Sequence, residues 1–341
     1  MRGKTKHVMM HKLNLLLFSL LLLAGQVLAQ QVPASLNATL DGYEYPHPVN
    51  YFEVELEGGK YKMAYMDVAP AKKATDAPVV MLLHGKNFMG AYWRQTIDFL
   101  SKNGFRVVVP DQIGFGKSDK PEVYYTFHQL AQNTQQLLQH LGVRQVAVVG
   151  HSMGGMVATR FALMYPEMTS KLVLENPIGL EDYRVMVPYK SMQELYQAEL
   201  KQTEQAIRNY HQTYYPAWKP EFNEWVQVPA AQINHPDYPK VAKVSALTFA
   251  MIYQQPVVYE FGNVKAPTLV VIGQEDRTIV GKGYIQDKAK QQQYGQYPQL
   301  GKQTAKAIPQ AQLLELQNVG HIPHLEVPKR FHQELLRFLK K

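Results

Sequence analysis

Short, continuous apolar runs recur through the sequence and alternate with amphipathic segments. The runs lie at Val79–Leu83, Arg106–Val109, Val146–Val149, Leu172–Leu174 and Leu269–Ile272. Runs of this kind are typical of strands buried on both faces, as in a parallel sheet. The amphipathic segments predict helices over Tyr92–Lys102, Phe127–Leu141 and Met153–Tyr165. This alternation predicts an α/β fold built on a doubly wound, mostly parallel sheet.

Further elements are predicted on both sides of this core. Tyr51–Glu57 and Lys60–Asp67 flank Gly58-Gly59, which indicates a β-hairpin with a two-residue turn. Near the other end, Leu313–Leu316 predicts a strand, and Pro328–Leu339 predicts a helix with proline at its start.

The interval between the strand runs at 172–174 and 269–272 breaks the alternation. Residues 176–264 are rich in aromatic side chains and lack clean strand runs, while Met192–Tyr210 and Val241–Tyr253 have helical patterns. We therefore expect a helical cap over 176–264, inserted between two parts of the core at 30–175 and 265–341. Most of its aromatic residues are expected to fill the cap's own interior, and a few to line an apolar substrate pocket.

Length and composition exclude several classes of protein. The 341 residues suit one large domain, or a core with an insertion. An apolar share of 46% and a charged share of 19% exclude a disordered chain, a collagen-like repeat and a long coiled coil. The absence of cysteine excludes a disulfide framework, a cysteine nucleophile and thiolate metal sites.

The N-terminal 29 residues have the layout of a secretory signal peptide. A basic stretch over residues 1–12 precedes an apolar run at Leu13–Ala24, and Val27-Leu28-Ala29 provides small residues for cleavage. The run is too short for a spanning helix, which needs roughly 20 residues. We expect cleavage after Ala29, a periplasmic or secreted mature protein, and no stable membrane insertion once the signal is removed.

The net charge of +8 is concentrated in this predicted signal. Residues 1–29 hold Arg2, Lys4, Lys6 and Lys12 and no acidic residue, so their removal lowers the net charge from +8 to +4. The rest of the sequence shows no basic cluster of the kind that binds nucleic acid. We therefore expect a small-molecule substrate and no nucleic-acid partner; oligomeric state is left open.

The sequence Gly150-His151-Ser152-Met153-Gly154 follows a predicted strand directly and opens a predicted helix. A bare Gly-x-Ser-x-Gly arises by chance in roughly one chain in ten of this length. Its place between strand and helix is more specific, because a strained turn there lifts the serine hydroxyl clear of the sheet, and only small residues fit on either side. Ser152 is the predicted nucleophile.

A serine nucleophile needs a general base, which we expect at the end of a strand. His321 fits, because it lies in a loop after the run Leu313–Leu316, with Gly320 before it. His324 is the competing candidate. His84 and His151 lie near the same region, but His84 is expected to pack beneath a neighbouring loop and His151 to point away from the reaction.

The acid that orients the base is expected at the end of a strand between serine and histidine. Asp276 follows the run Leu269–Ile272, with Glu275 beside it as an alternative. Glu175, after the preceding run, is a second possible orienting group. The order Ser152, Asp276, His321 is the chain order of a triad in this strand–turn–helix setting.

Acyl chemistry also needs donors for the oxyanion, which backbone amides can supply. The amide of Met153, the residue after the nucleophile, is one expected donor. The second is expected from the loop after Val79–Leu83, where we select the amide of Lys86, with Asn87 as the alternative. The Lys86 side chain is not needed for that role.

Taken together, the chain resembles the α/β-hydrolase superfamily. The matching stretches are Leu82–Gly85, Asp111–Ser118, Gly150–Gly155, Gly273–Asp276 and Gly320–Glu326. The resemblance extends to the capped group that includes epoxide hydrolases, haloalkane dehalogenases, carbon–carbon bond hydrolases and esterases. It implies a Ser152-Asp276-His321 triad. Acyl transfer on such a triad needs no metal or organic cofactor, so we expect none.

Two departures narrow what the resemblance implies. Epoxide hydrolases and dehalogenases of the group carry aspartate where this chain has Ser152, and Gly85-Lys86-Asn87-Phe88 does not match the loop of proline iminopeptidases. We therefore expect hydrolysis of a small to medium carboxylic ester, lactone or thioester. The alternatives are a carbon–carbon bond hydrolase or perhydrolase on the same triad and, from another class, a small-molecule receptor.

Overall fold

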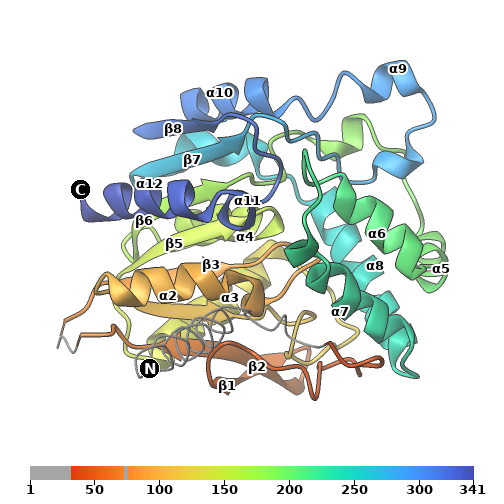
Figure 1. Ribbon diagram of the computed structural model, residues 1–341, viewed down its shortest axis with the longest axis horizontal. Helices are drawn as coiled ribbons and strands as arrows, with labels where there is room; N and C mark the ends of the chain where they lie inside the picture. The colour runs from red at the N-terminus through yellow and green to blue at the C-terminus, as the bar shows by residue number, and fades with distance from the viewer. Residues whose placement is uncertain (1–31, 73–75) are drawn as a thin grey trace, which may run out of the picture. The chain divides into compact units, whose positions relative to one another are not determined.

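An eight-stranded sheet runs through residues 32–72 and 76–341, the part of the chain that the computed structural model describes (Figure 1). Its strands are β1 (Val49–Leu56), β2 (Gly59–Val68), β3 (Val79–Leu83), β4 (Arg106–Pro110), β5 (Val146–His151), β6 (Thr169–Glu175), β7 (Thr268–Gly273) and β8 (Ala311–Leu316). The order across the sheet is β1-β2-β4-β3-β5-β6-β7-β8. Only the pairs β1–β2 and β2–β4 are antiparallel, so the predicted fold class is confirmed.

The predicted signal peptide over residues 1–29 lies outside the described residues. Within the described ranges, no helix is both long and apolar enough to cross a membrane.

The N-terminal hairpin forms as expected, but its turn lies one residue earlier than the sequence predicts. Leu56 pairs with Gly59, so the two turn residues are Glu57 and Gly58, with φ angles of 49° and 78°. Positive φ at both positions is the type I′ geometry that matches the twist of paired strands. Gly59 is therefore the first residue of β2, and the prediction of a Gly58-Gly59 turn was wrong.

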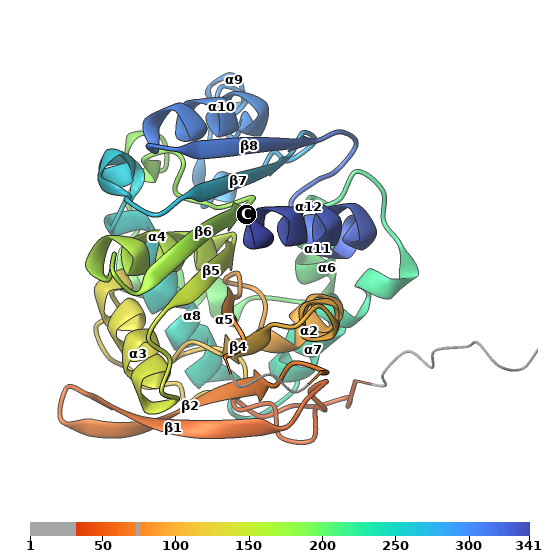
Figure 2. The ribbon, with the colours of Figure 1, turned by 90° about the vertical axis from the view of Figure 1, so that its left-hand side faces the viewer.

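Helices cover both faces of the sheet. In Figure 2, α2 (Arg94–Lys102) and α12 (Pro328–Lys340) lie on one face, and α3 (Phe127–His140) and α4 (Met153–Met164) lie on the other. Because a strand residue points to the face opposite from its neighbours, the central strands must be apolar throughout to bury both sides. This requirement explains the continuous apolar runs of the sequence.

Strand β3 illustrates the division of the core. Val80 and Leu82 belong to the buried cluster that includes Ile97 of α2, whereas Met81 and Leu83 belong to the cluster on the α3–α4 side. These four β3 side chains are fully buried. The strand that leads into the loop beside Ser152 is therefore packed on both faces.

The interval between β6 and β7 forms a helical layer at one end of the strands, on the right in Figure 1. It contains α5 (Met192–Leu200), α6 (Glu204–Gln212), α7 (Glu224–Ile233) and α8 (Tyr238–Gln254). The helix predicted over Met192–Tyr210 is two helices, because Thr203 caps α6 by accepting a hydrogen bond from the Ala206 amide. Helix α7 was not predicted, and it contains Pro229, a residue that argues against a helix interior.

Candidate active site

Ser152 occupies a strained turn between β5 and α4. Its φ and ψ are 55° and −121°, a conformation that non-glycine residues rarely adopt. A Cβ added to Gly150 would lie 2.2 Å from the Gly154 carbonyl oxygen, and one added to Gly154 would lie 2.2 Å from the Leu83 carbonyl oxygen. Glycine on both sides is thus required by the close approach of β5, α4 and the end of β3.

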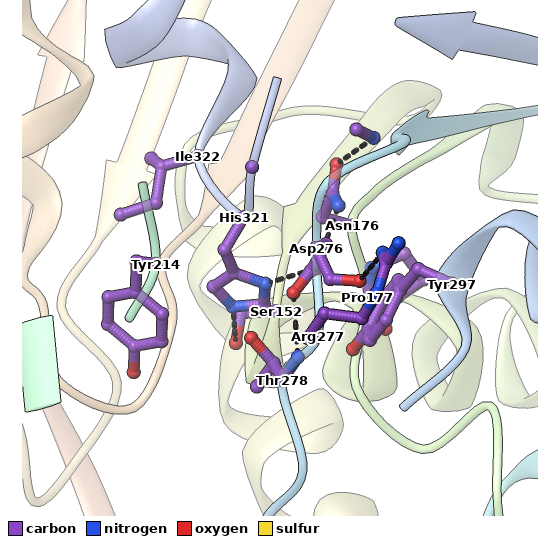
Figure 3. A network of polar contacts seen from close by, with 12 residues as sticks. Ser152, Asn176, Pro177, Tyr214, Asp276, Arg277, Thr278, Tyr297, His321 and Ile322 are labelled. Atoms are coloured by element: carbon purple, nitrogen blue, oxygen red, sulfur yellow. Dashed lines mark hydrogen bonds and ion pairs between the residues drawn. The ribbon is translucent and has the colours of Figure 1, made fainter. Parts of the chain in front are cut away.

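The structure brings Ser152, His321 and Asp276 into one hydrogen-bonded line (Figure 3). Ser152 Oγ lies 3.0 Å from His321 Nε2, and His321 Nδ1 lies 2.6 Å from Asp276 Oδ2. One tautomer satisfies both contacts, with Nδ1–H donating to the carboxylate and Nε2 accepting from the serine hydroxyl. In this arrangement the imidazole is positioned to accept the serine proton.

Asp276 is almost completely buried but well supplied with donors. Oδ2 also accepts a hydrogen bond from Asn176 Nδ2 (2.8 Å), and Oδ1 accepts one from the Thr278 amide (2.8 Å). Burial raises the pKa of this carboxyl group, but the positive charge of His321 and the three donors lower it by more, so the pKa lies below its usual value. Asp276 is therefore ionised at neutral pH, and its carboxylate can accept the hydrogen bond that His321 Nδ1–H donates.

Asn176 was not predicted as a site residue. It follows β6 with a φ of 37°, and its side chain bridges two strand ends, because Oδ1 accepts from the Gly273 amide (2.9 Å) while Nδ2 donates to Asp276. The one signal in the sequence was that Asn176 directly follows a buried strand. The same criterion, a polar residue at the end of a strand, had selected Asp276. The Asn176 amide thereby helps to hold the Asp276 carboxylate in the position in which it contacts His321.

The competing acids and histidine lie elsewhere. Glu275 is exposed, whereas Asp276 beside it is buried. The Glu175 carboxylate accepts from the amide of His324 (2.8 Å) and lies 3.0 Å from His324 Nδ1, and it makes no hydrogen bond to His321. Glu175 and His324 thus form a separate buried pair behind the site.

His151, next to the nucleophile, joins three loops of the site. Its Nε2 donates to the His321 carbonyl (2.9 Å), and its Nδ1 accepts from Tyr92 Oη (3.0 Å). Tyr92 Oη in turn accepts from the Gly85 amide (3.1 Å). Burial, with the charges of neighbouring histidines, lowers the pKa of His151 far below its usual value, so the ring is neutral as this network requires. His84 Nδ1 also contacts the Gly85 carbonyl, beneath the loop as expected.

The loop after β3 lies against the nucleophile. A Cβ added to Gly85 would be 3.1 Å from the Ser152 Cβ. The Gly85 amide already donates to Tyr92 Oη, and the next amide along the loop is that of Lys86. Met153 is the first residue of α4, directly after Ser152. Oxyanion binding by the Lys86 and Met153 amides stays a prediction. The alternative, Asn87, uses its side-chain amide to donate to Tyr214 Oη (2.8 Å).

The segment that follows α6 covers the other side of the imidazole. The Tyr214 ring stacks on His321 with centroids 4.8 Å apart and planes 22° apart, and the Tyr214 carbonyl accepts from the His321 amide (2.7 Å). A Cβ added to Gly320 would lie 2.1 Å from that carbonyl oxygen. Tyr214, which the sequence offered only as one of many cap aromatics, thus holds His321 from the cap side.

A cavity of about 540 Å³ opens at Ser152. It is lined by the loop after β3 and by residues of α6, α7 and α8, with apolar side chains such as Ile178, Ile207 and Phe249 among them. This volume lies in the range of small-molecule sites. The site is therefore a serine with a positioned base at the wall of a pocket between core and cap.

Lys120, in the loop before α3, also lines this cavity and is 3% exposed. Its Nζ donates to the carbonyls of Gly116 (2.7 Å) and Ser118 (3.0 Å). Burial lowers the pKa of Lys120 from 10.5 to about 7, although Asp111 and Asp119 act to raise it. Near neutral pH this ammonium is therefore close to losing its charge.

We expect Lys120→Met to flatten the dependence of stability on pH. Between pH 7 and 10 the unfolded chain keeps the Lys120 proton that the folded chain loses, so the wild-type free energy of unfolding gains up to about 1.4 kcal/mol per pH unit from this group. Urea unfolding of both proteins at pH 7 and pH 9 measures the difference. Equal pH dependence in the two proteins would show that Lys120 keeps its proton when buried.

Comparison with known proteins agrees with this architecture. Residues 78–328 match the model of the alpha/beta hydrolase fold family. A solved structure from Pseudomonas aeruginosa PAO1, described as a probable hydrolytic enzyme, is 44% identical, with a TM-score of 0.88, and the alignment covers 91% of this chain and 99% of that one.

Two curated relatives match over a shorter stretch. Epoxide hydrolase 2 of Siraitia grosvenorii is 40% identical over 98 residues, which are 28% of this chain and 31% of that protein. Cis-3-alkyl-4-alkyloxetan-2-one decarboxylase of Xanthomonas campestris pv. campestris is 35% identical over 123 residues, which are 33% of this chain and 39% of that protein. The matched segments thus span a third or so of the curated relatives. The family model matches most of the chain, and the sheet, the serine turn and the cap agree with it. The chain therefore belongs to the alpha/beta hydrolase fold family.

Proposed function

We propose that this protein is a serine hydrolase that cleaves a small to medium carboxylic ester, lactone or thioester through an acyl-enzyme on Ser152. The observation that carries the proposal is the unbroken line from the Ser152 hydroxyl through His321 to the ionised Asp276, ending at the cavity wall. The 44% identical relative described as a probable hydrolytic enzyme supports the same class of reaction.

In the first half of the reaction, Ser152 Oγ attacks the carbonyl carbon while His321 Nε2 takes its proton. Asp276 stabilises the imidazolium that forms, and the Lys86 and Met153 amides hold the oxyanion of the tetrahedral intermediate. Such donors are worth roughly 3 kcal/mol each in comparable sites. His321 then protonates the leaving alkoxide or thiolate, and the acyl group remains on Ser152.

In the second half, a water molecule takes the place of the alcohol or thiol. His321 Nε2 takes a proton from the water as it attacks the acyl carbon, and returns that proton to Ser152 Oγ when the second tetrahedral intermediate collapses. The carboxylic acid leaves and the free serine is restored. Tyr214, stacked on His321, keeps the imidazole in place through both proton transfers.

A fluorophosphonate probe tests whether the serine is activated. We expect the wild-type protein to gain one phosphonate on the peptide containing Ser152, seen by mass spectrometry, because the probe reacts only with a serine whose proton a base removes. His321→Ala should lose the labelling. Ser35→Ala, which changes an exposed serine, is the matched control and should label like the wild type. An unlabelled wild-type protein would contradict the proposal.

A further inference from the structure

The charges around the cavity are unbalanced. The charged residues that line it are Lys86, Lys120, Lys282 and Glu199. Lys120 turns its ammonium to two backbone carbonyls and loses its charge near neutral pH, and Lys282 is exposed. Lys86 is therefore the cation that the cavity itself holds.

Lys86 crosses from the loop beside the nucleophile to the cap. Its backbone follows Gly85, where an added Cβ would lie 3.1 Å from Ser152 Cβ, and its Nζ donates to Ser245 Oγ of α8 (2.7 Å). An ammonium has three N–H donors, and Ser245 Oγ is the single hydrogen-bond acceptor that the described residues provide for it. Two N–H donors of Lys86, which lines the cavity, thus have no acceptor among the described residues.

No described carboxylate forms an ion pair with Lys86. Burial lowers the pKa of its ammonium group, while the charge of Glu199 raises it, so the protein supplies only partial compensation. Removing an ammonium from water without a partner costs several kcal/mol. An anionic group of a bound ligand would supply the compensation that the described residues leave incomplete.

We propose that the site takes a substrate with a second, anionic group beside its scissile ester, lactone or thioester, and that Lys86 Nζ binds that anion. The inference rests on the proposed serine hydrolase function and adds the substrate class to it. Because the lysine starts beside Ser152 and ends at α8, the anion lies within one lysine side chain of the acyl carbon. A carboxylate fits, since its negative charge pairs with the ammonium and its oxygens accept charge-assisted hydrogen bonds.

Two pairs of matched substrates test this class. On the acyl side, mono-4-nitrophenyl glutarate is compared with 4-nitrophenyl pentanoate; on the alcohol side, 4-carboxyphenyl acetate is compared with 4-carbamoylphenyl acetate. We expect kcat/KM of the wild-type protein to favour the anionic member of one pair by at least about tenfold. The pair that shows the preference identifies which part of the substrate carries the anion.

Variants assign the preference to Lys86. Lys86→Met should bring the anionic-to-neutral ratio of kcat/KM to about one, mainly through KM, whereas Lys86→Arg should retain the preference because it keeps a cation. Ser245→Ala distinguishes anion binding by Lys86 from a purely structural role, in which the Lys86–Ser245 hydrogen bond holds α8 against the core. If Lys86 serves only to hold α8, Ser245→Ala and Lys86→Met will each lower kcat/KM by the same factor for both substrates of a pair. That result would show that the proposal is wrong.

The outcomes separate this inference from the underlying function. Equal turnover of charged and neutral esters by the wild-type protein, with an unchanged ratio in Lys86→Met, overturns the anionic substrate class while the serine hydrolase function stands. Failure of fluorophosphonate labelling together with no turnover of either substrate overturns both.

Discussion

Ser152→Ala is expected to lower kcat for 4-nitrophenyl pentanoate by about 10⁴-fold or more. The variant removes the proposed nucleophilic oxygen, so we expect that only the predicted oxyanion donors and the binding pocket would continue to act. Ser152 is 7% exposed, and its amide donates to the Glu175 carbonyl (3.2 Å), a contact that alanine keeps. Stopped-flow and steady-state assays of 4-nitrophenol release measure the loss of kcat.

The fold of this variant should be unchanged. Alanine occupies the same strained backbone as serine and fills less space, so we expect the melting temperature to stay close to that of the wild type. The fluorophosphonate label should disappear at the same time. Full turnover by a correctly folded Ser152→Ala protein would reject Ser152 as the nucleophile and, with it, the reaction proposed above.

Asp276→Asn is expected to lower kcat by about 10³- to 10⁴-fold. Both carboxylate oxygens accept hydrogen bonds: Oδ2 from His321 and Asn176, and Oδ1 from the Thr278 amide. An asparagine has one N–H₂ group, so either orientation aims a donor at another donor. Turning N–H₂ toward His321 also stabilises the tautomer with its proton on Nε2, which cannot accept the serine proton.

The pH profile distinguishes this effect from simple loss of packing. In the wild-type protein, the ionised Asp276 stabilises the protonated imidazole. Without that charge the His321 imidazolium is less stable, so the lower limb of the kcat/KM profile should move to lower pH. Glu275→Gln, next in sequence and exposed, is the matched control and should leave rate and profile unchanged. A small rate loss with an unshifted profile in Asp276→Asn would argue against the orienting role.

Much of the core was predictable because its signals are local. Each continuous apolar run became a strand, and β3 matches its predicted range at both ends, since a strand buried on two faces has no other pattern available. The turn at Ser152 was predictable for a related reason. Backbone crowding around Ser152 permits only glycine at Gly150 and Gly154, so the sequence shows the Gly-x-Ser-x-Gly pattern.

The cap was less predictable because its helices depend on what they pack against. Thr203 divides one expected helix into α5 and α6 through a single side-chain cap, and α7 forms in spite of Pro229. The contacts that support the triad from neighbouring residues could not be predicted from the sequence either. Asn176 and Tyr214 act on residues about a hundred positions away, and no periodicity of the sequence reports such a pairing.

The amino-acid sequence by itself determined which strands exist, where the serine turn lies and which residue types stand at the strand ends, because these follow from steric limits and burial within short segments. Only the tertiary structure decided that Asp276 rather than Glu275 or Glu175 contacts His321, that His151 ties the loops together, and that Lys86 lies in the pocket without a carboxylate partner. Those outcomes depend on distances between segments far apart in the chain, which packing sets and local sequence does not.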